Sequence, residues 1–591
     1  MIKQKRSKNQ KEIMDRVLPV FMVCVVLPLI VRLHVYTEDL EECSWFGFDT
    51  YFTDFFNYSK SIVFYIIVVW MLAKLLWERL QGRRVFTGSP CLLLFGVIFA
   101  FYLISAFLAK DTSLSWGGGY QSFQGTFVLI GYFVLCAYAY GRMDRDACIV
   151  VFYRSNVCIS VISCIIGFLQ LIGQDPFFWN PVQRLIIPGA YAGATLEREL
   201  RANTVYLTMG NPNYASIFLA AQIILISIFL ITNQNQTKKI LLGLLDLGLL
   251  VCVWFTYSRV GLAMLFAAAF AAILLCRRQW KMNRRRLLLT GIAIALGLLA
   301  LDAATGLRFA ERLRGTVQSF TQERKNCEID DLRTESDGIY FAQNGIRLRM
   351  YIVGEFAQNE NIRFETSDGT DITNFYEEDT NVLAYEGLEE VSAFIDTIDG
   401  EPMLVLKIAE TCFRFVKEES DGYLLYVGNG HYDTVRPVES FGFSGMEHIA
   451  SGRLYLWSRT LPLLKSNWLL GCGADNFFLV YPQHDYVGKA QYCSDPLTIV
   501  ERPHSAYLKL AVEQGMIPFV LLMAAYGSFM RREWCYFRKT ADYTARQWLV
   551  LGCFLVSIAY MAAFLFNDWN INVMPLFWVA VGIAAGSSTG A

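Results

Sequence analysis

Long runs of apolar residues, separated by short polar loops, occupy most of this chain. About twelve of these runs approach 20 residues, the length at which a helix crosses the hydrocarbon core of a bilayer. The pattern therefore predicts a mainly α-helical, polytopic membrane protein with about twelve transmembrane helices. The runs lie near residues 17–34, 61–78, 89–109, 125–140, 148–172, 214–232, 239–256, 261–276, 286–305, 505–528, 547–566 and 573–590.

A different pattern fills residues 328–440, between the ninth and tenth runs. Apolar and polar positions alternate there, and Gly, Asn and Asp separate the alternating stretches, which include IYFAQNGIRLRMYIVGEF, NIRFETSDG, EPMLVLKIAE, CFRFVKEE and GYLLYVG. This alternation is typical of strands and predicts a small β-rich domain. The stretch holds 25 acidic and 8 basic residues, which we interpret as a solvated surface.

The predicted organisation has five parts. Helices one to nine occupy 1–305, a linker occupies 306–327, the β-rich insertion 328–440, a loop 441–504, and the last three helices 505–591. Within the loop, RLYLWSRTLPLLKSNWLLG has Leu and Trp at helical spacing, which favours a helix at the membrane interface.

Charge predicts the orientation. The N-terminal MIKQKRSKNQKEIMDR and loops such as CRRQWKMNRRR and RREWCYFRK are rich in Lys and Arg, whereas the alternate loops, such as NDWNIN, are poor in them. Since positive residues gather on the cytoplasmic side, both termini are expected in the cytoplasm and residues 306–504 outside. The first run lacks a small-residue cleavage site, so we expect a retained helix. Hydrophobic residues make up 54% of the chain and charged residues 18%, which excludes an ordinary soluble domain.

Cysteine usage is typical of buried packing. Most of the fifteen cysteines lie in apolar runs, where they act as small hydrophobic residues, and no C-x-x-C pair occurs. The sequence thus gives no support for a zinc or thioredoxin-type site. Cys472 and Cys493 fall on the predicted outer side, where they are compatible either with a disulfide or with two free thiols.

Two arginines stand at the predicted outer surface. Arg259 interrupts an apolar stretch in FTYSRVGLAM, and Arg453 begins the predicted interfacial helix in SGRLYLW. Each has an ordinary interpretation, as a snorkelling helix end or a headgroup contact. Arg259, however, lies on the side that positive residues avoid, which favours binding of an anion.

Other polar residues gather on the same side. His504, in RPHSAYLKL, follows Pro503 and is expected in extended backbone at the mouth of the bundle. Its imidazole can accept a proton from a hydroxyl, or it can be a cap or interface residue. Asn211 and Asn213, in MGNPNYAS, are typical of a helix cap. The glycines of SWGGGYQSFQGTF allow close backbone approach or a flexible loop. One base and two arginines suit a reaction between a hydroxyl acceptor and a lipid diphosphate donor.

Four stretches together resemble the O-antigen ligase and polymerase superfamily of bacterial membrane glycosyltransferases. The stretches are MGNPNYASIFLA, YSRVGLA, SGRLYLWSRTLPLLKSNWLLGCGADNFFLVYP and RPHSAYLKLAVEQGMIPFVLL, and the resemblance covers about residues 89–580 without the insertion. It implies a GT-C-type helical membrane fold with no metal and no cofactor. The implied partners are an undecaprenyl-diphosphate-linked glycan, a hydroxyl acceptor (a glycan, lipid or surface polymer) and membrane lipid, with no nucleic acid.

The resemblance also implies roles for single residues. His504 would be the general base, and Arg259 and Arg453 would bind the diphosphate. Asn211 and Asn213 match the turn before a helix, where the role is structural or donor-facing, and Tyr507 is expected to bind substrate. Ser505 departs from the family pattern, because many members carry Asn after the histidine.

The function expected from these features is metal-independent, inverting glycan transfer at the outer face of the bacterial plasma membrane. Ligation and polymerisation of lipid-linked repeat units use the same chemistry and differ only in the acceptor. A flippase that moves the lipid-linked glycan without chemistry is less favoured, because the polar residues lie at the outer surface and no repeated halves are evident.

Overall fold

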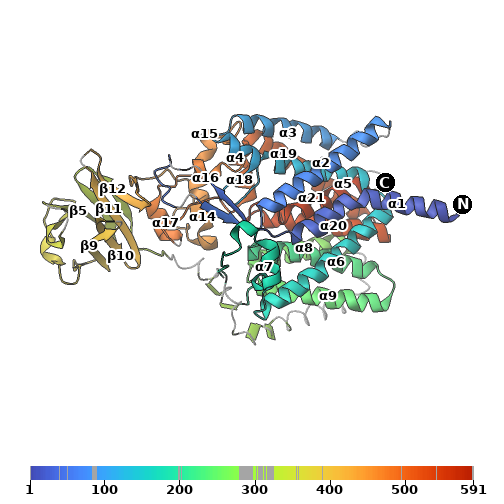
Figure 1. Ribbon diagram of the computed structural model, residues 1–591, viewed down its shortest axis with the longest axis horizontal. Coiled ribbons are helices and arrows are strands. Elements are labelled where there is room, and N and C mark those ends of the chain that lie inside the picture. The colour runs from blue at the N-terminus through green and yellow to red at the C-terminus, as the bar shows by residue number, and fades with distance from the viewer. Residues whose placement is uncertain are drawn as a thin grey trace.

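The computed structural model describes residues 2–588, apart from 39, 41, 49–50, 83–89, 198–199, 201–202, most of 278–324, and single positions at 355, 357, 389, 399, 419, 494 and 541. A helical bundle and a separate β-sheet region lie at opposite ends of the long axis (Figure 1). Both termini lie at the end of the bundle that is remote from the β-sheets.

The described part of the chain contains four helices long and apolar enough to cross a membrane. These are α2 (Tyr58–Leu80), α6 (Asp146–Leu171), α8 (Pro212–Thr232) and α20 (Ala545–Ala563). Shorter apolar helices accompany them, namely α3 (Pro90–Phe107), α5 (Thr126–Arg142), α10 (Arg259–Leu275) and α21 (Met574–Ser588). A helical membrane protein is therefore supported, although the predicted number of about twelve spans is not shown.

Several predicted spans differ from the helices at their positions. The run at 17–34 is not one helix, because α1 (Ile2–Phe21) passes at Met22 into the π-helical turn η1 (Met22–Val26) and then into the 3-10 turn η2 (Leu27–Leu29), which contains a proline. The run at 505–528 is divided at Gly515, whose φ of 86° ends α18 (Ala506–Gln514) before α19 (Met516–Lys539) begins. Helix α9 (Gln236–Phe255) carries three charged residues. The run at 286–305 lies almost wholly outside the described residues.

Helix α8 occupies the centre of the bundle and packs against α6, α9, α10 and α20, while α21 packs along α5. Two glycines of α21 make that second contact possible. A Cβ on Gly582 or Gly586 would lie 2.5 Å from the backbone oxygen of Cys136 or Tyr140, so only a residue without a side chain allows this approach.

Short elements lie around the end of the bundle that faces the β-sheets. They are the paired strands β1 (His34–Thr37) and β2 (Tyr51–Asp54), the helices α4 (Thr112–Gly117), α7 (Asn180–Ile186), α14 (Ile449–Thr460), α15 (Leu463–Ser466), α16 (Phe477–Val480) and α17 (Tyr486–Tyr492), and the 3-10 turns η3 (Pro176–Phe178) and η4 (Gly189–Tyr191). The predicted interfacial helix of residues 453–471 is thus divided into α14 and α15.

The β-sheet region consists of two antiparallel sheets. One has four strands in chain order, β3 (Asp331–Glu335), β4 (Gly338–Gln343), β5 (Ile346–Ile352) and β6 (Ile362–Thr366). The other has seven, also in chain order, β7 (Tyr376–Glu377), β8 (Val382–Leu383), β9 (Val391–Ile398), β10 (Glu401–Ile408), β11 (Thr411–Glu418), β12 (Gly422–Gly428) and β13 (His431–Asp433). Each of the five alternating sequence stretches contains at least one strand, and the Asn-Gly turn at 344–345 joins β4 to β5.

The core of the β-sheet region includes part of the loop that follows it. Tyr486 and Ala490 of α17 are buried among the apolar side chains of the strands. The hydroxyl of Tyr486 donates a hydrogen bond of 2.6 Å to Asp433 at the end of β13. The β-sheet region is therefore attached to residues 486–490 as well as through its own ends. Cys472 and Cys493 of this loop are both free thiols, so the disulfide considered from the sequence is not formed.

Candidate functional site

His504 lies in a loop between the β-sheet region and α18. The preceding carbonyl, of Pro503, accepts a hydrogen bond of 2.9 Å from the indole nitrogen of Trp457 on α14. The expectation of extended backbone at His504 is wrong, because its φ is 52°. The proline rule restricts the residue before a proline, here Arg502, and leaves the following residue free. A left-handed conformation in a residue with a Cβ costs about 1–2 kcal/mol, so the surrounding contacts must hold this turn.

The imidazole of His504 faces the carboxylate of Asp568, in the loop between α20 and α21. Their Nδ1 and Oδ2 atoms are 3.5 Å apart, the distance of an ion pair. The His504 side chain is 44% exposed, whereas that of Asp568 is 1% exposed. Because Nδ1 faces Asp568, the second ring nitrogen, Nε2, remains for another partner. The arrangement matches a base whose orientation is set by a buried carboxylate.

Asp568 is ionised in spite of its burial. Burial alone would raise the pKa of this carboxyl, but interaction with His504 and the positive charges of Arg502 and Lys509 outweigh burial, and the pKa lies below its ordinary value. Neither carboxylate oxygen makes a hydrogen bond to the described residues. The carboxylate is therefore stabilised first by His504 and then by the positive charges of Arg502 and Lys509.

Arg453 interacts with the same carboxylate, that of Asp568. Burial lowers the pKa of its guanidinium, the carboxylate of Asp568 raises that pKa, and the positive charge of Arg259 lowers it again. Asp568 therefore interacts with both His504 and Arg453, and Arg453 in turn interacts with Arg259, although these residues are far apart in sequence.

Contacts of α14 place Arg453 there. The rings of Trp457, on α14, and Phe566, beside Asp568, stack with centroids 5.8 Å apart and an interplanar angle of 20°. On the other side, Tyr455 and Arg459 both donate hydrogen bonds to Asp485, of 3.0 and 2.8 Å. The helix is fixed along two of its faces, and Arg453 is in its first regular turn, after three residues in left-handed conformation.

Arg259 is positioned by the neighbouring helix α8. The hydroxyl of Ser258 donates a hydrogen bond of 2.7 Å to Oδ1 of Asn213 and accepts one of 3.0 Å from Ser216. A Cβ on Gly261 would lie 2.8 Å from the carbonyl oxygen of Ser216, so the first turns of α8 and α10 touch directly. Asn213 therefore supports the turn that carries Arg259.

The same hydrogen bonds leave the start of α10 without a side-chain cap. Ser258 occupies the N-cap position, but its hydroxyl is directed to Asn213 and caps no backbone N–H. The first four N–H groups of a helix have no partner within the helix, and together with the helix dipole they attract anions. The first turn of α10 and Arg259 form a suitable binding site for a phosphate group.

The other two predicted substrate-binding residues occupy different positions. Asn211 is the N-cap of α8, and its side-chain oxygen accepts a hydrogen bond of 2.8 Å from the backbone of Asn213. The hydroxyl of Tyr507 donates a hydrogen bond of 2.8 Å to the carbonyl oxygen of Met561, which ties α18 to α20. Asn211 lines the cavity described next, whereas the hydroxyl of Tyr507 is engaged by the backbone.

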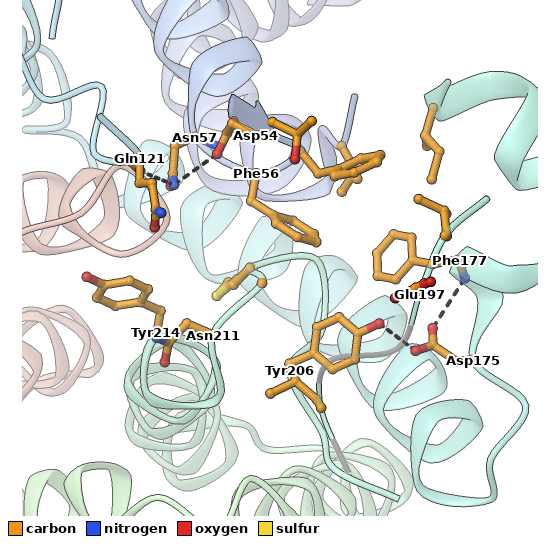
Figure 2. A pocket seen from close by; sticks show the side chains of 18 of the residues that line it. Asp54, Phe56, Asn57, Gln121, Asp175, Phe177, Glu197, Tyr206, Asn211 and Tyr214 are labelled. Carbon is orange, nitrogen blue, oxygen red and sulfur yellow. Dashed lines mark hydrogen bonds between the residues drawn. The ribbon is translucent and has the colours of Figure 1, made fainter. Parts of the chain in front are cut away.

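A cavity of about 540 Å³ adjoins this cluster. Asn211 and Tyr214 from α8, Arg502 and Asn570 line it, the last two being two residues away from His504 and Asp568 in sequence. Figure 2 shows Asn57 and Gln121 on one side of it and Tyr206, Asp175 and Glu197 on another. A guanidinium nitrogen of Arg502 donates a hydrogen bond of 3.1 Å to the hydroxyl of Tyr214, joining the wall of the cavity to the His504 loop.

The glycine-rich loop SWGGGYQSFQGTF is folded around a buried carboxylate. The backbone N–H groups of Gly119 and Gln124 donate to Oδ2 of Asp475, at 3.3 and 2.7 Å, and the ammonium of Lys509 lies 3.1 Å from Oδ1. Tyr120, Gln121 and Phe123 have positive φ angles. This loop is therefore an ordered wall of the site, which places Gln121 at the cavity.

Sequence reasoning missed three residues of this arrangement: Asp568, Asp475 and Arg502. Asp568 stands in NDWNIN, a loop poor in positive charge, where a carboxylate between two apolar runs is itself a signal of a functional residue. Asp475 and Arg502 lie in the stretches that carry the family resemblance.

No protein-family model, no curated protein and no solved structure matches this chain.

Proposed function

We propose that this protein is a membrane glycosyltransferase that transfers a glycan from an undecaprenyl-diphosphate-linked donor to a hydroxyl acceptor at the outer face of the bacterial plasma membrane. The observation that carries the proposal is the interaction of Asp568 with His504 and Arg453, together with that of Arg453 with Arg259 at the uncapped start of α10. A base next to a binding site for anions is what displacement of a diphosphate requires.

The distribution of charge supports the proposed side of the membrane. The end of the bundle that holds the termini carries ion pairs of Arg16 with Asp144, Arg142 with Glu78, and Arg546 with Asp146. The His504 cluster lies at the other end of the helices, since α8 and α10 both begin there. Positive residues mark the cytoplasmic side, so the cluster would face the exterior.

In the proposed reaction, Nε2 of His504 accepts the proton of the acceptor hydroxyl as that oxygen attacks the anomeric carbon. The bond from this carbon to the phosphate oxygen breaks, and undecaprenyl diphosphate leaves with the electron pair. Arg259, Arg453 and the N–H groups in the first turn of α10 stabilise the charge that grows on the leaving group. Asp568 holds the imidazole and stabilises its protonated form. A single displacement inverts the anomeric configuration.

The same residues serve ligation and polymerisation, because the two reactions differ only in the acceptor. A flippase would leave the glycosidic bond to the carrier intact. Full-length protein in nanodiscs, given lipid-linked glycan labelled in its sugar, separates these outcomes. Label on longer carrier-linked chains indicates polymerisation, label on an added acceptor indicates ligation, and label that stays on unchanged donor contradicts transfer.

The decisive variant is His504→Ala, with His431→Ala in the β-sheet region as the matched control. We expect the first to abolish transfer with its melting temperature retained, and the second to transfer as the wild type does. Near-normal transfer by His504→Ala would overturn the assignment of the base. The position lies in a strained turn, so His504→Gln, which keeps the size and polarity of the side chain, checks that a loss reflects chemistry and not folding.

A further inference from the structure

The cavity beside the His504 cluster is separate from the proposed diphosphate site. Its described lining includes neither Arg259 nor Arg453 nor His504. It is bounded by the ends of α2, α6 and α8, by strand β2 with the residues that lead into α2, and by the 3-10 turn η3. At about 540 Å³ it is within the range of small-molecule sites. Its place next to the cluster makes it a candidate site for one of the two substrates.

The lining combines aromatic surfaces with polar side chains that have no hydrogen-bond partner among the described residues. Tyr51 is 72% exposed at the cavity, and the rings of Phe56 and Phe177 meet edge to face with centroids 6.0 Å apart. The side chains of Gln121 and Glu197 make no hydrogen bond to the described residues. A sugar ring can stack its C–H faces on such aromatic surfaces, and its hydroxyls can form hydrogen bonds with such polar side chains.

The charge of the described lining is negative. The lining contains three carboxylates, those of Asp54, Asp175 and Glu197. It contains one guanidinium, that of Arg502, which already donates to Tyr214 and lies 3.4 Å from Glu501. Asp54 accepts hydrogen bonds from the start of α2, and Asp175 accepts one from Tyr206, so Glu197 is the carboxylate whose hydrogen-bonding capacity is available. Such a lining disfavours phosphates and acidic sugars and favours hydroxyls and amines.

We propose that this cavity binds an uncharged or amine-bearing sugar residue of the glycan substrate, with the ring against Tyr51 and Phe56 and its polar groups on Gln121 and Glu197. The inference rests on the proposed function for the identity of the substrate, but the binding itself does not depend on catalysis. The sugar belongs either to the acceptor or to the donor glycan, and the chemistry of recognition is the same for both.

Equilibrium binding to full-length protein in nanodiscs tests the proposal with three probes of equal length: fully deacetylated chitotetraose, N-acetylated chitotetraose and tetragalacturonate. We expect the amine-bearing and neutral probes to bind and the acidic probe not to bind. Glu197→Gln should lower the affinity for the amine-bearing probe about tenfold and that for the neutral probe by less than about threefold, because only the amine loses a charge-assisted contact. Tyr51→Ala should weaken both.

Matched controls are Glu410→Gln, in an exposed turn of the β-sheet region, and Phe441→Ala, at a position 66% exposed and outside the cavity. Both should bind as the wild type does. A wild type that binds none of the probes, one that binds tetragalacturonate as tightly as the others, or a Glu197→Gln variant with unchanged affinities would overturn the proposal.

Saturating lipid-linked donor identifies the source of the sugar. If the donor leaves probe binding unchanged, the cavity is an acceptor site, and if it displaces the probe, the cavity holds the donor glycan; either result supports a sugar site. The same titrations with His504→Ala keep the two proposals apart. If the wild type binds the probes selectively but transfers no glycan, the proposed function is wrong and the sugar site stands. If it transfers glycan but does not bind the probes selectively, the proposed function stands and the sugar site is wrong.

Discussion

Arg459 donates a hydrogen bond of 2.8 Å from Nε to the carboxylate of Asp485, and this contact joins the helix that carries Arg453 to the segment on which the β-sheets rest. Asp485 is 8% exposed and also accepts the hydroxyl of Tyr455. The position of a proposed diphosphate-binding arginine therefore depends on a carboxylate that does not itself touch the substrate.

Substituting Asp485→Asn should lower both the melting temperature and the rate of transfer. A hydrogen bond to a charged group contributes about 1.5–3 kcal/mol, and its loss frees α14 to shift. Glu439→Gln is the control, because Glu439 pairs with Lys465 at the surface, where ion pairs contribute little. Melting and transfer equal to the wild type in Asp485→Asn would refute this positioning role.

Arg259→Gln and Arg453→Gln should each reduce transition-state stabilisation by about 2–4 kcal/mol, the usual effect of removing one donor from a site of developing negative charge. The lysine variants should recover only part of the loss, since an ammonium lacks the two-pronged geometry of a guanidinium. Steady-state rates with labelled donor measure the effect. The exposed Arg184 of α7 supplies a control in Arg184→Gln. Transfer rates of the Arg259 and Arg453 variants within a few-fold of wild type would contradict the binding of the diphosphate by these two arginines.

Asp568→Asn should change the acid stability of the protein. The pKa of Asp568 is lowered in the folded state, so its contribution to stability is present above the unfolded pKa and is lost as the pH falls through the folded value. The melting-temperature advantage of wild type over Asp568→Asn should be constant above about pH 4 and shrink below it. Melting curves from pH 3 to 7 test this, and an advantage that persists undiminished at pH 3 would count against an ionised Asp568.

Ser258→Ala should slow transfer through Arg259. The variant loses the hydrogen bonds to Asn213 and Ser216, each of which contributes about 1 kcal/mol, and the turn before α10 loosens. We expect kcat/KM to fall about fivefold and the melting temperature to fall as well. In Ser155→Ala, the lost hydroxyl bonds only to the backbone of its own helix, and transfer should be unaffected. Equal transfer rates in the two variants would refute a role of Ser258 in positioning Arg259.

Tyr507→Phe distinguishes packing from substrate binding. The hydroxyl of Tyr507 is held by the carbonyl oxygen of Met561, so its removal should cost about 1 kcal/mol of stability and leave transfer within about threefold of wild type. Thermal melting and steady-state transfer measure the two effects. If transfer falls more than tenfold at an unchanged melting temperature, the hydroxyl acts on the substrate.

Sequence patterns predicted the elements that local periodicity determines. The apolar runs at 61–78 and 214–232 lie within α2 and α8, and the alternation in EPMLVLKIAE lies in β10. The divisions were missed because they depend on single residues: the φ of Gly515 ends α18, and the turn at 27–29 ends the first run. Strands β7 and β8 are two residues long, too short to show any period.

The candidate site was predictable only in part, for a related reason. His504, Arg259 and Arg453 stand out as polar residues in apolar surroundings, and such residues are usually functional in membrane proteins. Asp568 becomes visible only when the C-terminal loop lies against the His504 turn, and Gln121 only when the glycine-rich loop folds around Asp475. Contacts between distant segments leave no local pattern in the sequence, so neither residue of such a pair can be predicted from the sequence around the other.

The packing of α17 into the β-sheet region has a consequence for experiments on that region. A chain shortened by excising residues 328–440 would leave Tyr486 and Ala490 without the strands that now cover them, and Asp433 would be removed from the hydroxyl of Tyr486. Since Asp485 is the adjacent residue, the disturbance would reach Arg453 through α14. Inactivity of such a deletion would therefore reflect the disruption of α17 and α14. Only substitutions on the outer strand surfaces can reveal whether the β-sheets themselves recognise a ligand.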